Sequence, residues 1–358
     1  MYYLYPDYYK KFHCIADKCI DTCCAEWQIV IDDESLEKYR NYKGDYQQTL
    51  CQNIDWEEGV FGHNKRGKCA FLRDDDLCDM YIHMGEDSLC TTCREYPRHT
   101  EEFENLREIT LSLSCPEVAK IVMNTTEPIT FVTKEDETDK CYEEFDYFLF
   151  SELEDVREEM IRIIQDRNVN LRDRIDKILQ ISVSVQRHYD AGSLISWNEF
   201  EESDRVCVEN EYELFERLFL FLFEEFEILY PQWAEVLVES RLFLFGEGKK
   251  VFEQNKEEFE TWWNTSNLTP LDIVLEQLVV YFISVYLLGA VYDENILGKV
   301  DACIGHTIEI YLLLLGRWLK HGELAMDDVI EVVYRYSREI EHSDENLERA
   351  EMLNWFAR

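Results

Sequence analysis

The sequence predicts a mainly α-helical protein in which a small, cysteine-rich N-terminal domain with a few short strands precedes a larger helical domain. Glycine (13) and proline (6) are scarce among the 358 residues, a composition typical of helices joined by short connections. The 13 cysteines are concentrated near the N-terminus. The chain is longer than a single hydrophobic core usually accommodates. We therefore expect a cysteine-rich domain (1–125), a connection (126–145) and an acidic helical domain (146–358).

Short elements are expected in the first of these parts. EWQIVID (26–32) has strand character, and DDESLEKYRNYKG is typical of a helix that starts near Asp32 or Asp33 and ends before Gly44. REITLSLS alternates apolar side chains on one face, which favours a second strand.

The segment SCPEVAKIVM predicts a helix directly after that strand. Ser114 can cap it, Pro116 fits its first turn, and Glu117 stands three residues after Ser114, as a capping box requires. Cys115 is then placed at a helix N-terminus, where backbone amides and the helix dipole favour a thiolate.

Helical periodicity dominates the remainder of the chain, because apolar pairs alternate with acidic residues at three- and four-residue spacing. The segments that show it are YFLFSELEDVREEMIRII, LRDRIDKILQISVSVQRHY, ENEYELFERLFLFLFEEFEILY, PQWAEVLVESRLFLF, VFEQNKEEFETWWN, LDIVLEQLVVYFISVYLLGAVY and HTIEIYLLLLGRWLKHG. The apolar stretch 278–292 is shorter than the roughly 20 residues that cross a bilayer, so we expect a buried core helix and no membrane span. The aromatic stripe is likewise expected to be core: Phe215, Phe219, Phe221 and Phe223.

Nine cysteines are the candidate metal ligands. They are Cys14, Cys19, Cys23, Cys24, Cys69, Cys78, Cys90, Cys93 and Cys115. Thiolates gathered so densely select zinc or iron–sulfur clusters. Disulfides and inert buried thiols are the alternatives, but disulfide frameworks usually occur in short secreted chains. The other four are expected to be small buried apolar residues: Cys51, Cys141, Cys207 and Cys303.

Charge and the N-terminal sequence limit the partners and the compartment. The formal net charge is -39, and most of the acidic excess lies in the helical part. Nucleic acid is therefore excluded as a partner, whereas a Lys-rich protein is compatible with this surface. Acidic helix faces also serve simply to keep a protein soluble. MYYLYPDYYKKFHC shows no secretory signal, and we expect a cytoplasmic location.

The cysteine motifs resemble a known family. DTCCAEWQIVID, CAFLRDDDLC, LCTTCREYPR and LSLSCPEVAK are similar to the flagellin lysine N-methylases, and the first three also resemble the cysteine-cluster proteins described as zinc- or iron-chelating. LEQLVVYFISVYLLGAVYDENILGKV is similar to the methylase family as well. The resemblance implies a methyltransferase that uses S-adenosylmethionine to methylate Lys side chains of flagellin. It also implies an iron–sulfur cluster, most simply 4Fe-4S with zinc as the alternative, held by the nine cysteines.

The sequence leaves the arrangement of this chemistry open. Nine thiols exceed the four that one cubane cluster needs, so two metal sites or a partial ligand set are both compatible with it. Arg94, Tyr96 and Arg98 follow a candidate ligand and could support the cofactor through hydrogen bonds or charge, or could simply pack. CxxxCxxC is absent, since Glu26 stands where its third cysteine belongs, and no glycine-rich loop marks a donor site.

Methylation of an amine also requires a base. Carboxylates are abundant throughout the chain, and their spacing does not single out one of them as this base. The oligomeric state is equally undetermined by the sequence. Two other hypotheses remain. In one, the chain is a non-catalytic zinc- or iron-binding protein that acts as a redox sensor or binds a partner protein. In the other, zinc merely stabilises a small domain.

Overall fold

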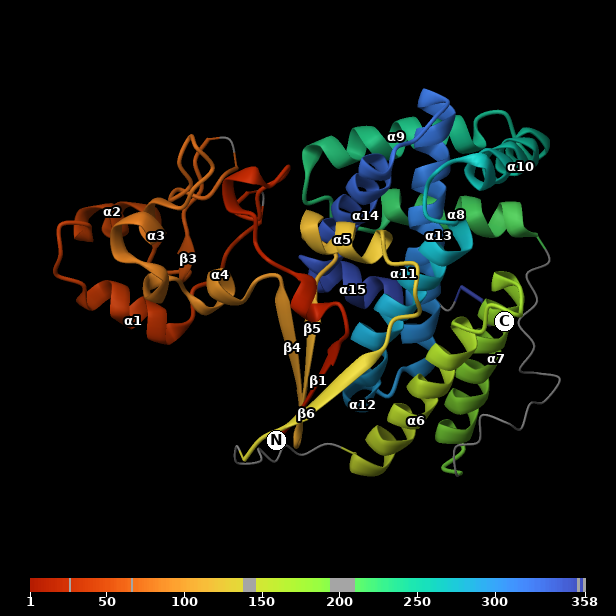
Figure 1. Cartoon of the computed structure of the whole chain (residues 1–358), viewed down its shortest axis with the longest axis horizontal. Helices are drawn as coiled ribbons and strands as arrows, with labels where there is room; N and C mark the ends of the chain where they lie inside the picture. Colours follow the sequence, from red (N-terminus) through yellow and green to blue (C-terminus); the bar gives the residue numbers. More distant parts are fainter. Residues whose placement is uncertain (26, 66, 138–145, 194–209, 353–354, 357–358) are drawn as a thin grey trace.

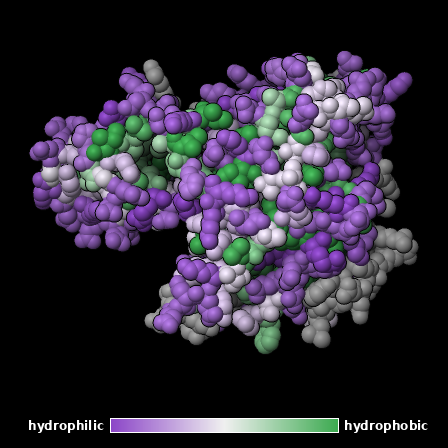
Figure 2. Space-filling model, in the orientation of Figure 1, coloured by the Kyte–Doolittle hydropathy of each residue, from purple (hydrophilic) through white to green (hydrophobic). Residues whose placement is uncertain are grey.

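A computed structural model describes the chain except residues 26, 66, 138–145, 194–209, 353–354 and 357–358. A small lobe built from α1 to α4 stands beside a larger body of helices, and a sheet lies next to that body (Figure 1). Hydrophilic residues cover much of the face seen in Figure 2. The mainly helical fold class predicted from the sequence is confirmed.

The small lobe has its own core. Its elements are α1 (Asp33–Asn41), α2 (Gln47–Asn53), β2 (Ile54–Asp55), β3 (Val60–Phe61), α3 (Asp79–Met84), the 3-10 turn η3 (Glu86–Ser88) and α4 (Thr91–Glu95). Buried side chains from these elements and the loops between them, among them Tyr39, Leu50 and Phe71, form one cluster. The predicted helix start is confirmed, because the Asp32 carboxylate accepts a hydrogen bond from the Ser35 amide at 2.9 Å.

The strand expected at 26–32 is wrong for the residues that the structure describes. An isolated bridge between Val30 and Val60 replaces it, and Ile31 donates its amide to the Gly59 carbonyl at 2.8 Å. The alternation of apolar residues was real, since Ile29 and Ile31 are buried and Val30 is exposed. The short neighbouring strand β3 offers too few partners for a continuous ladder.

The sheet joins segments from both ends of the first 135 residues. Its strands are β1 (Tyr2–Pro6), β4 (Arg98–Phe103), β5 (Leu106–Leu111) and β6 (Phe131–Glu135), in the order β4-β5-β1-β6. β1 runs parallel to β5 and antiparallel to β6, while β4 and β5 form an antiparallel pair. Phe103 lies against Phe150 of the helical body, with ring centroids 5.0 Å apart. The sheet thus packs into the large core rather than into the small lobe.

The helix after β5 starts one residue later than its sequence predicts. α5 spans Pro116–Met123, and its N-cap is Cys115. Ser114 does not cap it, so the predicted capping box is wrong. The Ser114 side chain is fully buried, and its hydroxyl is bonded to those of Ser112 and Tyr96. Because the Ser114 hydroxyl is engaged in these tertiary hydrogen bonds, it does not cap the helix as the local sequence predicted.

The helical body follows the periodicity closely. It comprises α6 (Tyr147–Ile164), α7 (Leu171–Asp190), α8 (Glu211–Glu224), α9 (Pro231–Phe245), α10 (Lys249–Thr265), α11 (Leu271–Tyr286), the 3-10 turn η5 (Leu287–Gly289), α12 (Ala290–Asp293), α13 (Ile296–His321), α14 (Met326–Glu341) and α15 (Asp344–Glu351). α13 is buried along most of its length and packs against α7, α9 and α11. The aromatic stripe of α8 lies in or against the core, as predicted.

Two helical stretches, Leu271–Asp293 and Ile296–His321, are long and apolar enough to cross a membrane. The first is longer than the apolar stretch recognised in the sequence. Within their most apolar windows, however, 72% and 78% of the residues are buried inside the protein. Such burial is what core helices require, and it fits the expectation for 278–292.

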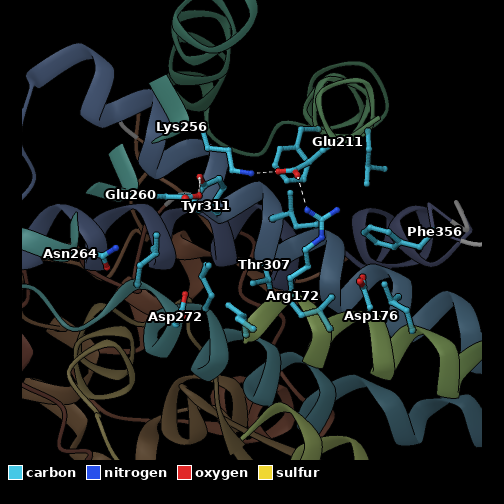
Figure 3. Close-up of a pocket in the computed structure, with 18 residues that line it drawn as sticks. Arg172, Asp176, Glu211, Lys256, Glu260, Asn264, Asp272, Thr307, Tyr311 and Phe356 are labelled. Carbon is cyan, nitrogen blue, oxygen red and sulfur yellow. Dashed lines mark hydrogen bonds and ion pairs between the residues drawn. The ribbon is translucent and has the colours of Figure 1, made fainter. Parts of the chain in front are cut away.

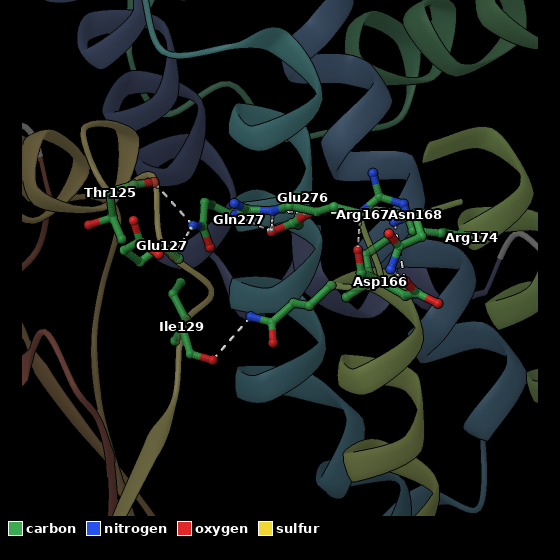
Figure 4. A network of polar contacts seen from close by, with 11 residues as sticks. Thr125, Glu127, Ile129, Asp166, Arg167, Asn168, Arg174, Glu276 and Gln277 are labelled. Atoms are coloured by element: carbon green, nitrogen blue, oxygen red, sulfur yellow. Dashed lines mark hydrogen bonds and ion pairs between the residues drawn. The ribbon is translucent and has the colours of Figure 1, made fainter. Parts of the chain in front are cut away.

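A buried ionic network holds α11 to the α6–α7 connection and α7 (Figure 4). The Glu276 carboxylate, which is fully buried, pairs with Arg167 at 2.8 Å and with Arg174 at 2.7 Å. Next to it, the Gln277 amide donates to the carbonyls of Thr125 and Glu127. The network therefore also fixes the chain that leads from α5 into β6.

Glu276→Gln should lower the free energy of unfolding by about 3–5 kcal/mol, because the nearly buried Arg174 guanidinium would lose its counter-charge. Denaturant titration of both proteins checks this. The matched control is Glu159→Gln, which removes the exposed Glu159–Arg162 pair and should cost less than about 1 kcal/mol. Equal losses in the two variants would contradict the stabilising role given to the buried pair.

Candidate active site

The structure divides the nine candidate ligands into two neighbouring groups. The first thiol group consists of Cys14, Cys19, Cys23 and Cys115. Burial is the main cause that raises the pKa of Cys19 and Cys115, and a hydrogen bond with Cys24 is the main cause at Cys23; the charge of Cys14 acts in the same direction on all three. The second thiol group consists of Cys24, Cys69, Cys78, Cys90 and Cys93, which lie in or against the core of the small lobe. None of the described cysteines forms a disulfide. The grouping rests on which thiols influence Cys19, Cys23 and Cys115 electrostatically and on which thiols lie at the core of the small lobe.

Local structure positions the second thiol group. The Cys69 amide donates to the Cys24 carbonyl at 2.8 Å, and Cys78 and Cys90 are the N-caps of α3 and α4. Burial, and then the charges of Cys24, Cys78 and Cys90, raise the pKa of Cys69 to about 12. A hydrogen bond from the adjacent Cys23 thiol lowers the pKa of Cys24 to about 7. The Cys23–Cys24 pair is therefore the point at which the two groups meet.

Two opposing effects act on the pKa of Cys115. The amides of Val118 and Glu117 do bond its thiol and lower its pKa, but burial outweighs them and raises the pKa to about 11. The two amides thus favour the thiolate, as the position at the helix N-terminus predicted, but their effect is smaller than that of burial. Desolvation of the charged form is the larger effect at this buried position.

The thiol groups have the donor chemistry of a zinc or iron–sulfur site, since sulfur is the ligand these metals prefer. Their side chains are gathered but do not form a closed coordination sphere. Among the residues described, no three His, Cys, Asp or Glu side chains have an arrangement that could hold a metal ion. The donor set fits such a group, and the present side-chain geometry does not.

Of the three predicted supporting residues, Tyr96 is influenced by thiols of the first group. Burial and the charges of Cys115 and Cys23 raise its pKa well above the ordinary value. Arg94 is exposed and pairs with its neighbour Glu95. Arg98 donates to the Tyr9 hydroxyl at 3.0 Å and lies over the rings of Tyr9 and Phe12.

The remaining cysteines have different environments. Cys303 is buried in α13, as predicted, whereas the same expectation for Cys51 is wrong because Cys51 is exposed. Cys141 and Cys207 lie outside the described residues.

A cavity of about 610 Å³ lies between the small lobe, the sheet and the helical body. This junction cavity is bordered by α4, β4, β5, α11, α14 and α15, and its size is ample for a small ligand. Aromatic side chains form much of its wall: Trp27, Tyr96, Tyr281 and Tyr286. Because Tyr96 also borders the first thiol group, the cavity and these cysteines adjoin.

Glu341, the last residue of α14, is the titratable group that stands out in the junction cavity. Its carboxylate accepts hydrogen bonds from the Tyr281 hydroxyl at 2.9 Å and from Ser112. Burial raises its pKa to about 7, although these two hydrogen bonds and the charge of His99 act in the opposite direction. At neutral pH the carboxyl is thus close to its midpoint and can take up a proton.

A chain of hydroxyl groups connects Glu341 with the first thiol group. Ser112 bonds both the Glu341 carboxylate and the Ser114 hydroxyl, and Ser114 lies 3.0 Å from the Tyr96 hydroxyl. Tyr96 in turn lies beside Cys115. Ser112 and Ser114 lie in the turn after β5, Tyr96 directly follows α4, and Glu341 ends α14, so the connection depends on the tertiary fold.

His342 stands next to Glu341 but points to another wall of the cavity. Its ring stacks on Trp27 with centroids 4.6 Å apart, and the Trp27 indole donates to the Cys23 carbonyl at 2.6 Å. The Nδ1 atom lies 3.3 Å from the Tyr230 hydroxyl, while buried Nε2 has no hydrogen-bond partner within the described part of the chain. Burial, followed by the charge of Arg338, lowers the His342 pKa to about 3, so the ring stays neutral.

Arg338 fastens the cysteine-bearing N-terminal segment to α14. Its guanidinium donates to the Ser114 carbonyl at 3.0 Å and to the Asp21 carbonyl at 3.1 Å. It also pairs with the Asp21 carboxylate at 3.0 Å, and only 3% of its side chain is exposed. One arginine thus connects the segment that carries Cys19 and Cys23 with the helix that carries Glu341.

The sequence contained a signal for Glu341 that the motif search missed. Val333, Ser337 and Glu341 recur at four-residue spacing on α14, and Val333 and Ser337 are fully buried. A carboxylate in line with a buried helix face is a candidate for a perturbed pKa.

Arg338→Gln should loosen the cysteine-bearing segment, so Cys19, Cys23 and Cys24 should react about tenfold faster with an alkylating reagent. Peptide mass spectrometry at several labelling times measures this. Arg317→Gln is the matched control, because Arg317 also pairs with α14, through Asp328 and Glu331, but away from the cysteines. Unchanged labelling in Arg338→Gln would show that other contacts hold the segment.

Comparison with known proteins shows which family this chain resembles. The FliB lysine N-methylase C-terminal domain matches residues 157–356, more than half of the chain. A lysine-N-methylase of Salmonella typhimurium is 30% identical over 128 residues, which are 33% of this chain and 32% of that protein. The flagellar biosynthetic protein FliU of Salmonella muenchen is also 30% identical over 128 residues, which are 75% of its length. No solved structure matches.

Proposed function

The chain belongs to the family of the FliB lysine N-methylase C-terminal domain, and from this premise we propose that it methylates lysine side chains of flagellin with S-adenosylmethionine as the methyl donor. The match spans about a third of the Salmonella typhimurium lysine-N-methylase, and a second relative is named for flagellar biosynthesis. The observation in the structure that supports the proposal most is the junction cavity with Glu341 on its wall.

Lysine methylation needs a neutral amine, because the ammonium form, with a pKa of roughly 10.4, has no free lone pair. In the proposed mechanism the Glu341 carboxylate accepts the proton of the substrate ammonium. Its raised pKa of about 7 makes it a stronger base than an ordinary carboxylate. The amine nitrogen then forms a bond to the donor methyl carbon as the bond from that carbon to the donor sulfur breaks.

Neighbouring residues hold the base in place. The Tyr281 hydroxyl accepts a hydrogen bond from the Leu113 amide at 3.1 Å and donates one to Glu341. Its acceptor and donor roles are therefore both determined. His342, kept neutral by burial, adds no positive charge that would repel a cationic substrate. The aromatic side chains on the wall lower the local polarity beside the carboxylate, which strengthens its interaction with the ammonium.

We further propose that the nine cysteines are ligands of two metal centres. The first thiol group has the four thiols that a 4Fe-4S cluster requires and adjoins the junction cavity, so we assign the cluster to it. The five thiols of the second group suffice for a structural zinc or iron centre. Both assignments require the side chains to turn toward a common centre. A cluster supplies redox or Lewis-acid chemistry when bound, and a cytoplasmic location would preserve reduced thiols.

Glu341→Gln should reduce the transfer of labelled methyl groups from S-adenosylmethionine to flagellin Lys by about 100- to 10,000-fold, as expected for loss of a general base. The wild-type rate should rise with pH through about 7 and then level off, because Glu341 must be ionised to accept a proton. Glu345→Gln, an exposed carboxylate of α15, should keep full activity.

A folding measurement separates this effect from misfolding. Ionisation of a carboxyl whose pKa is raised from 4.5 to about 7 opposes folding. Glu341→Gln should therefore gain free energy of unfolding relative to the wild type as the pH rises from 4.5 to 8. A folded Glu341→Gln variant with undiminished transfer would refute the assigned base, and no label on Lys with the wild type would refute the activity.

The two-centre assignment predicts about four iron and four sulfide ions per chain after anaerobic purification. Cys23→Ser should remove this iron and sulfide, while the metal of the second group remains. Cys303→Ser, a change within α13, is the control and should leave both contents unchanged. Zinc alone, in a colourless protein after reconstitution, would contradict the cluster and favour a purely structural metal.

A further inference from the structure

A second cavity, of about 300 Å³, lies within the helical body and apart from the junction cavity (Figure 3). Side chains of α7, α8, α10, α11 and α13 line it. Its floor is apolar and buried, with Leu179, Leu214 and Leu271 each less than a tenth exposed. Such a cavity, with polar groups limited to a few positions, has the character of a small-molecule site.

The polar groups lie around the mouth. Exposed or half-buried side chains there carry four carboxylates against two cations. Both cations, Arg172 and Lys256, pair with the same carboxylate, Glu211, as the dashed lines in Figure 3 show. The Lys256 ammonium also lies 5.7 Å from the centre of the Phe215 ring. The cations are thus already engaged by the protein.

The other three carboxylates have no such partner. Over the described ranges, no ion pair joins Asp176, Glu260 or Asp272 to a cation; Glu260 accepts only the Tyr311 hydroxyl, at 3.0 Å. Partial burial raises the pKa of Asp176, which Arg172 offsets in part. The mouth of the cavity therefore has an excess of two negative charges over an apolar interior.

We propose that this cavity binds a small organic ammonium compound, with the apolar body of the ligand on the leucine floor and its ammonium group at the acidic mouth. The carboxylates stand where the charge of such a ligand would lie. Among the described residues that line the interior, none offers a buried charge to a ligand that entered in the opposite direction. This site goes beyond lysine methylation and does not depend on it.

Three probes of similar size test the charge preference: 4-phenylbutylamine, 4-phenylbutanol and 4-phenylbutanoate. Calorimetric titration of the full chain at low ionic strength should give an affinity for the amine at least about tenfold above that for the carboxylate. Asp272→Asn, a change at the mouth, should weaken amine binding about threefold and leave the alcohol unaffected. Equal or tighter binding of the carboxylate, or no amine binding at millimolar concentration, would overturn the proposal.

A cavity-filling variant tests the location. Ile308→Phe should place extra volume in the cavity and weaken amine binding at least about tenfold. Leu242→Phe, at an exposed position of α9, is the matched control and should bind normally. Amine binding that survives in a folded Ile308→Phe variant would place the ligand elsewhere. Because no readout involves methyl transfer, failure of this proposal and failure of the methylase activity are distinguishable.

Discussion

The buried guanidinium of Arg338 determines how the two halves of the site meet. It bonds the Ser114 carbonyl and both the carbonyl and carboxylate of Asp21, while its own helix, α14, also carries Glu341. An arginine can form several such bonds at once because its donors are rigidly arranged. Since this charge is almost fully buried, its partners must remain in place. The cysteines and the junction cavity are therefore connected by the same side chain.

Burial is the main cause of the electrostatic character of this region. It raises the pKa of the Glu341 carboxyl and lowers that of the adjacent His342 ring, because in each case the charged form is desolvated. One residue thus becomes a base that titrates near neutrality and the other stays neutral. At Cys115 the same effect outweighs the helix N-terminus. The charge of Arg338 adds to the effect at His342 and partly explains why two neighbouring groups differ so much.

Local periodicity was sufficient to predict most of the helical body. The apolar spacing of 147–164 and 231–245 coincides with α6 and α9, because one face of each helix must be buried whatever its partner. The errors arose where distant groups decided the structure. Residues 27–32 lie beside a strand, β3, that is too short for a continuous ladder. Ser114 bonds Ser112 and Tyr96 instead of capping α5.

The candidate site was predictable only in part for the same reason. The spacing of the cysteines indicated the candidate ligands but could not assign Cys115 to the group of Cys14 and Cys19, which lie about a hundred positions away. Glu341 was one of 75 acidic residues, and only its four-residue spacing from Val333 and Ser337 on α14 set it apart. Its bonds to Ser112 and Tyr281 exist only in the folded chain.

The most direct test of the central claim is to locate the substrate lysine. A photo-crosslinking amino acid at Val285, on the wall of the junction cavity, should capture the flagellin peptide that carries the methylated Lys. The same group at exposed Leu242 should capture little of it, as peptide mass spectrometry would report. Capture of that peptide from Leu242 but not from Val285 would contradict the claim that the junction cavity receives the lysine.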